Sequence, residues 1–301
     1  MSQTNTARPP ATRRIRRHST GDRVALAVML GVPTLVVMGL VWGPAMASVF
    51  LSFTRWNGVT PIEFIGLQNY QQIVTIYPPF WPALRNNVIW LAVLALIATP
   101  LGLLLAVVLD KQLRATRFYQ GVFYLPVVLS LALVGFIWTL IYSQDQGLIN
   151  QLSGANVNWL GDPDINLGAV LVAAAWRHVG YIMVLYLAGL KGVDPSIKEA
   201  AQIDGANQVQ TFFQVVFPTL KPINIVVLVV TVIEGLRAFD IVYIINKGTN
   251  GLELLSVLIT NNIIGEASRI GFGSAIAVIL LVISLGFIIS YLWQTFRKDA
   301  R

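Results

Sequence analysis

The chain lacks cysteine entirely and has only two histidines, His18 and His178, among its 301 residues. Without cysteine there can be no disulfide framework, no thiolate metal site and no cysteine nucleophile. Two histidines cannot build a histidine-rich metal site either. Charged residues are also scarce, at 12% of the chain, whereas an ordinary soluble domain has about 25%. These shortages argue against a soluble enzyme that depends on a metal or a thiol.

Apolar residues, by contrast, are abundant. They make up 55% of the chain and give a mean hydropathy of +0.68, while the 24 glycines and 14 prolines are tolerated in packed transmembrane helices. A span needs about 20 apolar residues to cross a hydrocarbon core of about 30 Å. We therefore predict an all-α fold, a polytopic membrane helical bundle with six transmembrane helices. The predicted spans are Val24–Phe53, Asn86–Leu109, Phe123–Tyr142, Leu167–Leu190, Pro222–Ile245 and Gly271–Phe296.

Positive charges are distributed unequally between the connections of these spans. Fifteen of the 21 Lys and Arg residues lie before the first span, in the second and fourth connections or at the C-terminus, and four lie in the other connections. Because cytoplasmic loops carry the excess of Lys and Arg, we expect both termini in the cytoplasm. The net charge of +7 then reflects membrane orientation, and we expect no nucleic acid partner.

The first 23 residues are basic and contain few apolar side chains, so we predict a disordered cytoplasmic tail over residues 1–23. An Arg-rich start followed by an apolar stretch is also typical of a secretory signal peptide. The hydrophobic region of a signal peptide is only about 7–15 residues long, whereas Val24–Trp42 is longer and continues to Phe53. We interpret it as an uncleaved first span, and residues 24–301 as one transmembrane domain.

The fourth connection, residues 191–221, is far longer than two neighbouring helices need. Asp194 or Ser196 can cap a short helix that begins near Pro195, and Gly205 permits a sharp exit into a second short helix. Two short helices at an angle would form a compact protrusion on the cytoplasmic face. The alternative is an amphipathic connector lying at the membrane interface.

Part of this connection follows a known sequence pattern. Glu199-Ala200-Ala201 is followed after three residues by Gly205, and after nine more by Val215, one residue and Phe217-Pro218. This pattern resembles the EAA loop of ABC importer permeases, in which Ile and Leu usually stand at the positions of Val215 and Phe217.

The resemblance extends over nearly all of residues 24–301 and narrows to the carbohydrate-uptake permeases related to maltose and glycerol-3-phosphate transporters. It is carried, in the family's order, by the segments SFTRWNG, FIGLQNY, FWPALRNN, FYLPVVLSLALVGFIWTLIYSQDQGLIN and AFDIVYIINKG. One departure follows the fifth span, where the family often has a Gly-Gly-Pro turn and this chain has Lys247-Gly248-Thr249-Asn250-Gly251.

This resemblance implies a type I ABC importer permease fold and a division of labour between subunits. The implied partners are a second homologous permease subunit, a dimer of ATP-binding cassette ATPases, an extracytoplasmic solute-binding protein and the lipid of a bacterial or archaeal inner membrane. The chain would bind no cofactor and would not be an enzyme. It has no G-x-x-x-x-G-K-[ST] motif to hold phosphates, so ATP and Mg²⁺ are expected on the ATPase. The residues implied to couple to that ATPase are Glu199, Ala200, Ala201, Asp204, Gly205 and Pro218.

Five ionisable residues lie within the predicted spans: Arg177 and His178 in the fourth, and Glu234, Arg237 and Asp240 in the fifth. A charge at the centre of a membrane helix costs about 2.5–3.5 kcal/mol, so these side chains should face protein or a wet cavity. On a continuous helix, the three residues of the fifth span share one face. We expect Arg177, Glu234, Arg237 and Asp240 to be candidates for lining the solute path, with Tyr243 or a neighbouring aromatic ring stacking on a sugar.

A structural role is the alternative for the same residues. Glu234 and Arg237, like Arg237 and Asp240, are i, i+3 neighbours that can pair and hold the helix against its partner. This interpretation is favoured for Glu234, and for His178 we favour a buried histidine whose hydrogen bonds are satisfied.

The leading functional hypothesis is a transport subunit for a sugar or related polyol. A second hypothesis is a permease for glycerol-3-phosphate or glycerophosphodiesters, in which Arg177 and Arg237 would bind the phosphate. A self-sufficient secondary transporter would usually show internal repeats, which the six spans do not. An intramembrane hydrolase would need a nucleophile near His178, and no G-x-S-x-G motif stands there.

Overall fold

The computed structural model describes residues 20–111, 114–265 and 268–299. The chain divides into two units, Met1–Ala47 and Ser48–Arg301. The predicted tail lies outside the described residues up to residue 19, and helix α1 begins at Thr20 rather than Val24. The helical segment of the first unit runs from α1 (Thr20–Val37) through the π-helical turn η1 (Met38–Trp42) into α2 (Gly43–Leu51), whose residues from Ser48 onward belong to the second unit. Pro44 has no N–H to donate, and the neighbouring N–H of Gly43 bonds five residues back to Met38.

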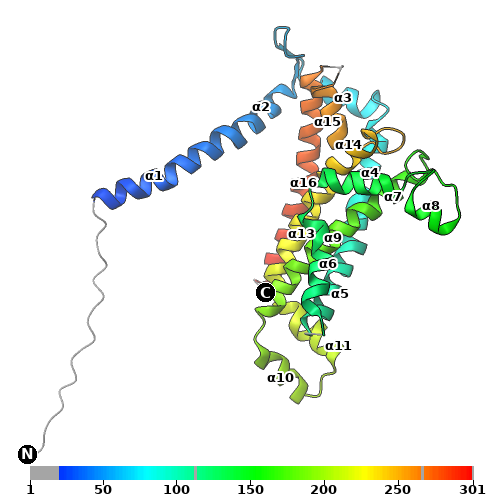
Figure 1. Ribbon diagram of the computed structural model, residues 1–301. Helices are drawn as coiled ribbons and strands as arrows, with labels where there is room; N and C mark the ends of the chain where they lie inside the picture. Colours follow the sequence, from blue (N-terminus) through cyan, green and yellow to red (C-terminus); the bar gives the residue numbers. More distant parts are fainter. Residues whose placement is uncertain (1–19, 112–113, 266–267, 300–301) are drawn as a thin grey trace, which may run out of the picture. The chain divides into compact units, whose positions relative to one another are not determined.

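The second unit is almost entirely helical (Figure 1). Its elements are β1 (Thr54–Arg55), β2 (Glu63–Phe64), α3 (Gln68–Thr75), α4 (Phe80–Val93), η2 (Leu94–Ala98), α5 (Thr99–Asp110), α6 (Thr116–Val128), α7 (Leu131–Ile141), α8 (Leu148–Ser153), α9 (Asn166–Lys191), α10 (Pro195–Ile203), α11 (Gln208–Thr211), η3 (Phe212–Val216), α12 (Phe217–Thr219), α13 (Lys221–Leu236), α14 (Asp240–Asn246), α15 (Leu255–Ile263) and α16 (Ile270–Asp299). The two short strands pair antiparallel, with Thr54 opposite Phe64.

Four continuous helices are long and apolar enough to cross a membrane among the described residues: Thr20–Leu51, Phe80–Asp110, Asn166–Lys191 and Ile270–Thr295. They correspond to the predicted first, second, fourth and sixth spans. A fifth candidate is the pair α6 and α7, which meet at a bend of 102°. The all-α membrane class is therefore confirmed, whereas six transmembrane helices are not: the predicted third and fifth spans are each interrupted.

The helices of these two predicted spans are interrupted at identifiable residues. In the third, the hydroxyl of Ser130 caps a new helix by accepting the N–H of Leu133 at 3.2 Å, and Ser130 itself is extended. In the fifth, α13 ends at Leu236 and α14 starts at Asp240, so the chain is irregular through Arg237–Phe239. The sequence stays apolar through both breaks, so hydropathy alone does not indicate where the helices end.

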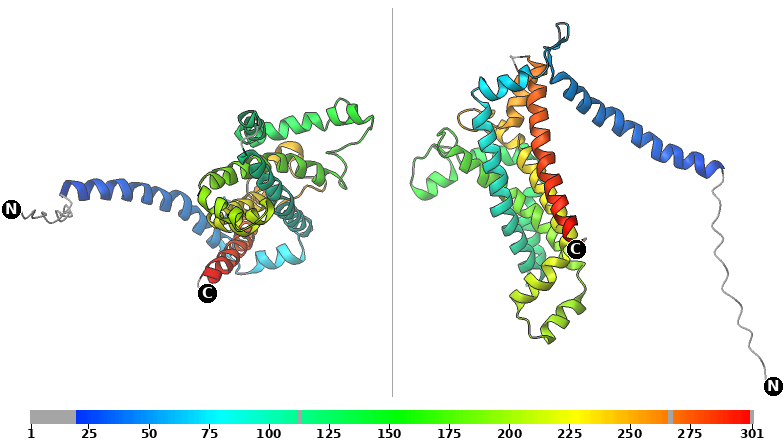
Figure 2. Two further views of the ribbon diagram at one scale, coloured as in Figure 1. Left: turned by 90° about the horizontal axis from the view of Figure 1, so that it is seen from below. Right: turned by 180° about the vertical axis from the view of Figure 1, so that it is seen from behind.

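Helix α9 lies at the centre of the second unit and packs against α5, α6 and α13. Close approach requires glycine at two places. A Cβ on Gly102 would lie 2.7 Å from the Cβ of Ile182, and a Cβ on Gly180 would lie 2.1 Å from the carbonyl oxygen of Phe123. The long helix α16 runs beside α13 and α15 (Figure 2).

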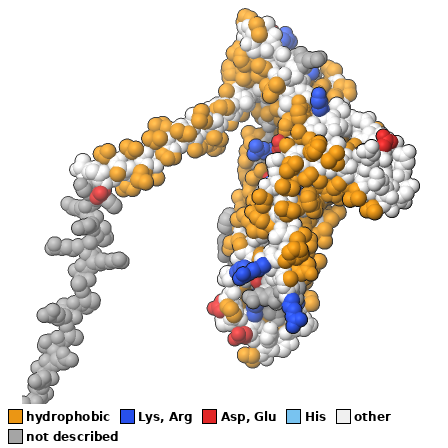
Figure 3. Space-filling model, viewed as in Figure 1, with side chains coloured by type: hydrophobic (Ala, Val, Ile, Leu, Met, Phe, Trp, Pro, Cys, Tyr) orange, Lys and Arg blue, Asp and Glu red, His pale blue; other side chains and the backbone are white. Residues whose placement is uncertain are grey.

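The surface of this unit is apolar around its middle. On the face drawn in Figure 3, hydrophobic side chains form a broad band, with charged side chains above and below it. Large apolar residues are more than half exposed on several helices, among them Leu96 at 75%, Phe136 at 56% and Ile289 at 60%. Exposed apolar area of this extent fits contact with lipid or with another membrane subunit.

Candidate functional site

A cavity of about 240 Å³ lies where α4, α7, α9, α13 and α14 meet. Four of the five predicted solute-path residues line it: Arg177, Glu234, Arg237 and Asp240. The fifth, Tyr243, stands one turn further along α14 and stacks on Phe239, with ring centroids 4.8 Å apart. Phe239 lines the cavity, whereas Tyr243 is not among the lining residues.

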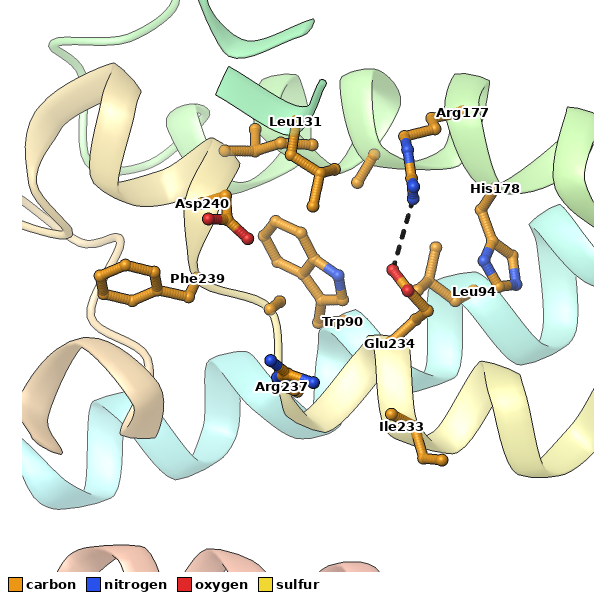
Figure 4. A pocket seen from close by; sticks show the side chains of 13 residues that line it. Trp90, Leu94, Leu131, Arg177, His178, Ile233, Glu234, Arg237, Phe239 and Asp240 are labelled. Carbon is orange, nitrogen blue, oxygen red and sulfur yellow. Dashed lines mark hydrogen bonds and ion pairs between the residues drawn. The ribbon is translucent and has the colours of Figure 1, made fainter. Parts of the chain in front are cut away.

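One ion pair crosses the cavity between helices (Figure 4). The Nη1 of Arg177 on α9 lies 3.5 Å from the Oε2 of Glu234 on α13. The Arg177 side chain is 21% exposed and that of Glu234 is 40% exposed. The Nε of Arg177 is buried and has no hydrogen-bond partner among the described residues, so the contacts of this guanidinium with the cavity come from its other nitrogens.

Arg237 and Asp240 reach the cavity because α13 stops before them. Arg237 follows the last residue of α13, and Asp240 begins α14. The premise that Glu234, Arg237 and Asp240 share the face of one continuous helix is wrong, but the break brings the same three residues to one cavity. In the part of the chain that the structure describes, neither Arg237 nor Asp240 forms an ion pair, and Glu234 pairs across helices rather than with its neighbour.

His178 lies beside the cavity and is 3% exposed. Its Nε2 lies 3.2 Å from the hydroxyl oxygen of Thr231 and 3.5 Å from that of Thr99, and these two hydroxyls are 3.2 Å apart. The cluster links α9, α13 and α5 deep inside the bundle. Hydrogen bonds of this kind offset the cost of burying a polar group, so the histidine has the satisfied environment expected for it.

The sequence reasoning missed a pair of buried asparagines on α4. Asn87 Nδ2 donates to the carbonyls of Gly235 and Leu236, at 3.4 and 3.2 Å, and its Oδ1 accepts the N–H of Leu255 at 2.9 Å. Asn86 donates to two carbonyls in the connection after α14. The only sequence signal was two adjacent amides at the start of an apolar run.

Trp90 also lines the cavity and was not predicted to do so. In Figure 4 its indole stands among the labelled charged side chains. It comes from α4, one turn after Asn86 and Asn87. A large aromatic residue in a continuous apolar span carries no sequence signal that separates core packing from a cavity wall.

The predicted coupling residues apart from Pro218 lie on α10 and the turn that follows it, at the opposite end of the unit from α3 and α15 (Figure 1). Asp194 caps α10 by accepting the N–H of Ser196 at 2.9 Å, and Pro195 occupies the first turn. The same hydrogen bond holds the pKa of the Asp194 carboxyl below its usual value. Ala201 packs inward and is 8% exposed, whereas Glu199 and Ala200 are exposed.

A sharp turn joins α10 to α11. Asp204 ends α10, and Gly205 has a positive φ of 84°, a conformation that favours glycine. Asn207 and Gln210 then form a capping box that starts α11. Pro218 lies in the first turn of α12, three residues before α13 begins at Lys221. The two short helices at an angle that the sequence predicted are thus both present, the second continuing through η3 and α12.

Residues 98–300 match the family described as the inner membrane component of binding-protein-dependent transport systems. The chain is 34% identical over 282 residues to the probable ABC transporter permease protein YurN of Bacillus subtilis, covering 90% of this chain and 95% of that protein. It is 31% identical over 297 residues to the xylose/arabinose import permease protein XacH of Haloferax volcanii, covering 95% and 92%.

The fold has a close structural counterpart. A crystal structure of a bacterial ABC transporter involved in the import of the acidic polysaccharide alginate contains a chain that superposes with a TM-score of 0.79. The two chains are 20% identical, and the match covers 92% of this chain and 96% of the other.

Proposed function

Because the chain belongs to the family of binding-protein-dependent transport system inner membrane components, we propose that it is the permease subunit of an ATP-driven ABC importer for a sugar or related polyol. It is a multi-pass membrane protein. The single observation that carries the solute-path role is the cavity with four charged side chains inside an otherwise apolar bundle. Ionisable side chains at this position mark a solute path in membrane proteins.

The solute class is supported by the relatives. XacH of Haloferax volcanii is named for xylose and arabinose import, and the trehalose/maltose permease protein MalF of Thermococcus litoralis is 31% identical over 281 residues. The cavity adds aromatic rings from Trp90 and Phe239 beside hydrogen-bonding groups, a combination suited to a sugar ring. A secondary transporter is no longer a competing function, because the family works as part of a binding-protein-dependent system.

Six membrane crossings are supported by contacts between the ends of the helices. Asp110 at the end of α5 lies 3.5 Å from Lys198 of α10. This contact supports two crossings between them, one through α6–α7 and one through α9. At the start of α16, the N–H of Gly271 donates to the carbonyl of Trp56 at 3.1 Å. At its other end, Lys221 donates to the carbonyl of Thr295 at 3.3 Å. These two contacts support a crossing by the segment from α13 to α15 as well.

The end that carries α10 would face the cytoplasm, as the excess of Lys and Arg on that side predicts. In our proposal, α10 and the Gly205 turn dock on a separate ATPase subunit, which binds ATP and Mg²⁺. Glu199 is exposed there, and Ile203 is 86% exposed beside it. A carboxylate next to an apolar side chain suits a protein surface that offers a basic group and a small pocket.

Two further partners complete the importer. A second homologous permease would form the other half of the path, and an extracytoplasmic binding protein would deliver the solute. The alginate transporter has been crystallised in complex with a periplasmic protein bound to an alginate pentasaccharide, which supports such a partner here. The corresponding cell membrane is bacterial or archaeal.

Co-purification with the neighbouring subunits tests this proposal. We expect an ATPase subunit and a second permease to co-purify, and a sugar-loaded binding protein to stimulate ATP hydrolysis. In that assay, Glu199→Lys and Gly205→Val should abolish the stimulation. Glu63→Lys and Gly154→Val should not, since Glu63 is an exposed residue of β2 and Gly154 shares the positive φ of Gly205 away from α10. The proposal fails if no ATPase subunit associates, and its coupling role fails if Glu199→Lys and Gly205→Val are both stimulated normally.

A further inference from the structure

The charges of the cavity balance within the described chain. Two guanidinium groups, Arg177 and Arg237, face two carboxylates, Glu234 and Asp240, on the same lining. Arg177 is the more buried of the ion-paired residues, and Glu234 is its partner. A lone arginine would leave a surplus positive charge that an acidic solute could neutralise.

An acidic solute would have to compete with the carboxylate of Glu234 for the guanidinium of Arg177, because the two side chains already form an ion pair. To reach Arg177, a uronate or phosphate would have to displace Glu234 or lie close to it, and two like charges in a partly buried site repel strongly. Asp240 opposes the same anion from the other side of the cavity. Arg237, the remaining cation, shares its space with these two carboxylates.

An uncharged sugar meets no such obstacle. The guanidinium of Arg177, whose side chain lines the cavity and is 21% exposed, can donate to a hydroxyl oxygen, and the carboxylates of Glu234 and Asp240 can accept hydroxyl protons. The volume of about 240 Å³ is below the range of about 300–1,000 Å³ found for pockets that hold drug-sized ligands. This chain's share of the path therefore suits a single sugar ring.

We propose that Glu234 is a specificity-determining residue that neutralises Arg177 and so makes the cavity select uncharged sugar units over uronates and sugar phosphates. The proposal rests on the solute-path role of the cavity. It assigns Glu234 a selective function where the sequence favoured a structural one, and it disfavours phosphate-ester transport. It also separates this chain from its structural counterpart, which imports an acidic polysaccharide.

Direct binding to the assembled importer tests this inference. The complex is reconstituted in nanodiscs without the binding protein, since that protein makes a selection of its own. Equilibrium dialysis then measures labelled glucose, xylose and arabinose against glucuronate, galacturonate and glucose 6-phosphate. We expect the wild type to bind at least one neutral sugar at least tenfold more tightly than any of the acidic solutes.

Charge-changing variants separate selectivity from simple damage. Glu234→Gln should raise the preference for acidic solutes at least tenfold, equivalent to about 1.4 kcal/mol, and Asp240→Asn should shift it in the same direction. The double variant R177Q/E234Q restores the balance of charge and should again reject acidic solutes. Glu63→Gln removes a carboxylate from an exposed ion pair with Arg55, outside the cavity, and should match the wild type.

The outcomes are decisive in each direction. An unchanged preference in Glu234→Gln overturns the proposal, as does a double variant that binds acidic solutes as well as the single one. If the wild type binds neutral and acidic sugars equally, the charge selection fails while the cavity remains a solute site. If it binds none of the probes, the solute-site assignment fails, whereas importer function is judged separately by stimulated ATP hydrolysis.

Discussion

Asn87 shows how one side chain can fix the shape of the cavity from behind its wall. The last carbonyls of a helix have no partner within the helix, and Asn87 supplies one to Gly235 and Leu236 at the end of α13. The same amide accepts the N–H of Leu255, at the first turn of α15. Three segments are thus held together at the point where Arg237 turns into the cavity.

Replacing Asn87 with alanine should lower the free energy of unfolding by about 1–3 kcal/mol, the cost of leaving a buried polar group unpaired. The side chain is fully buried, so water cannot take its place without rearrangement. The thermal unfolding midpoint of the purified protein in detergent measures the effect. Asn261→Ala, at an exposed position of α15, is the matched control and should leave the midpoint nearly unchanged. Equal midpoints for the two variants would contradict the predicted contribution of Asn87 to stability.

At the scale of the element, α9 organises the bundle because small residues let its neighbours approach. Gly180 brings α9 against the backbone of α6, and Gly102 of α5 meets Ile182 of α9. Close backbone approach through small residues is a main source of helix association in membranes, where no hydrophobic force drives helices together. The position of Arg177 relative to Glu234 depends on this packing, since Arg177 lies only three residues before Gly180.

Gly180→Ala should destabilise the bundle, because the new Cβ would meet the carbonyl oxygen of Phe123, a backbone atom with little freedom to move. Gly168→Ala is the control on the same helix. A Cβ there meets nothing within 4 Å, and alanine favours a helix over glycine by about 1 kcal/mol. We expect Gly180→Ala to lower the unfolding midpoint and the folded yield, and Gly168→Ala to leave both unchanged or higher. Comparable losses in both variants would refute the close contact between α6 and α9.

For the whole molecule, composition and hydropathy were sufficient for the membrane class and for the four long spans. Helix α9, predicted as Leu167–Leu190, differs from the observed Asn166–Lys191 by one residue at each end. The break near Arg237 could not be predicted, because its helix end is held by a tertiary partner, Asn87. The break near Ser130 depends on a local cap to the N–H of Leu133, which leaves the apolar composition unchanged.

Some residues of the candidate site could likewise be predicted from the sequence, and others could not. Charge inside apolar spans identified Arg177, Glu234, Arg237 and Asp240, since burying a charge is costly enough to single out any residue that does so. The partner of Glu234 could not be inferred, because pairing between helices depends on their packing. Trp90 was not predicted, because placing an apolar ring in an apolar span has no free-energy cost. Its position in the sequence therefore does not distinguish it from other apolar residues of the span.

The absence of cysteine allows the topology of the whole chain to be tested with single introduced thiols. Thr20, Ala155 and Ser196 are all exposed, and the six-crossing arrangement puts Thr20 and Ser196 in the cytoplasm and Ala155 outside. With a membrane-impermeant maleimide, Ala155→Cys should therefore be labelled in intact cells, whereas Thr20→Cys and Ser196→Cys should be labelled only after permeabilisation. The unmodified chain gives the background. If α6 and α7 doubled back at their bend instead of crossing, Thr20 and Ala155 would report the same side of the membrane. The reverse pattern at all three positions would instead overturn the orientation that the distribution of Lys and Arg predicts.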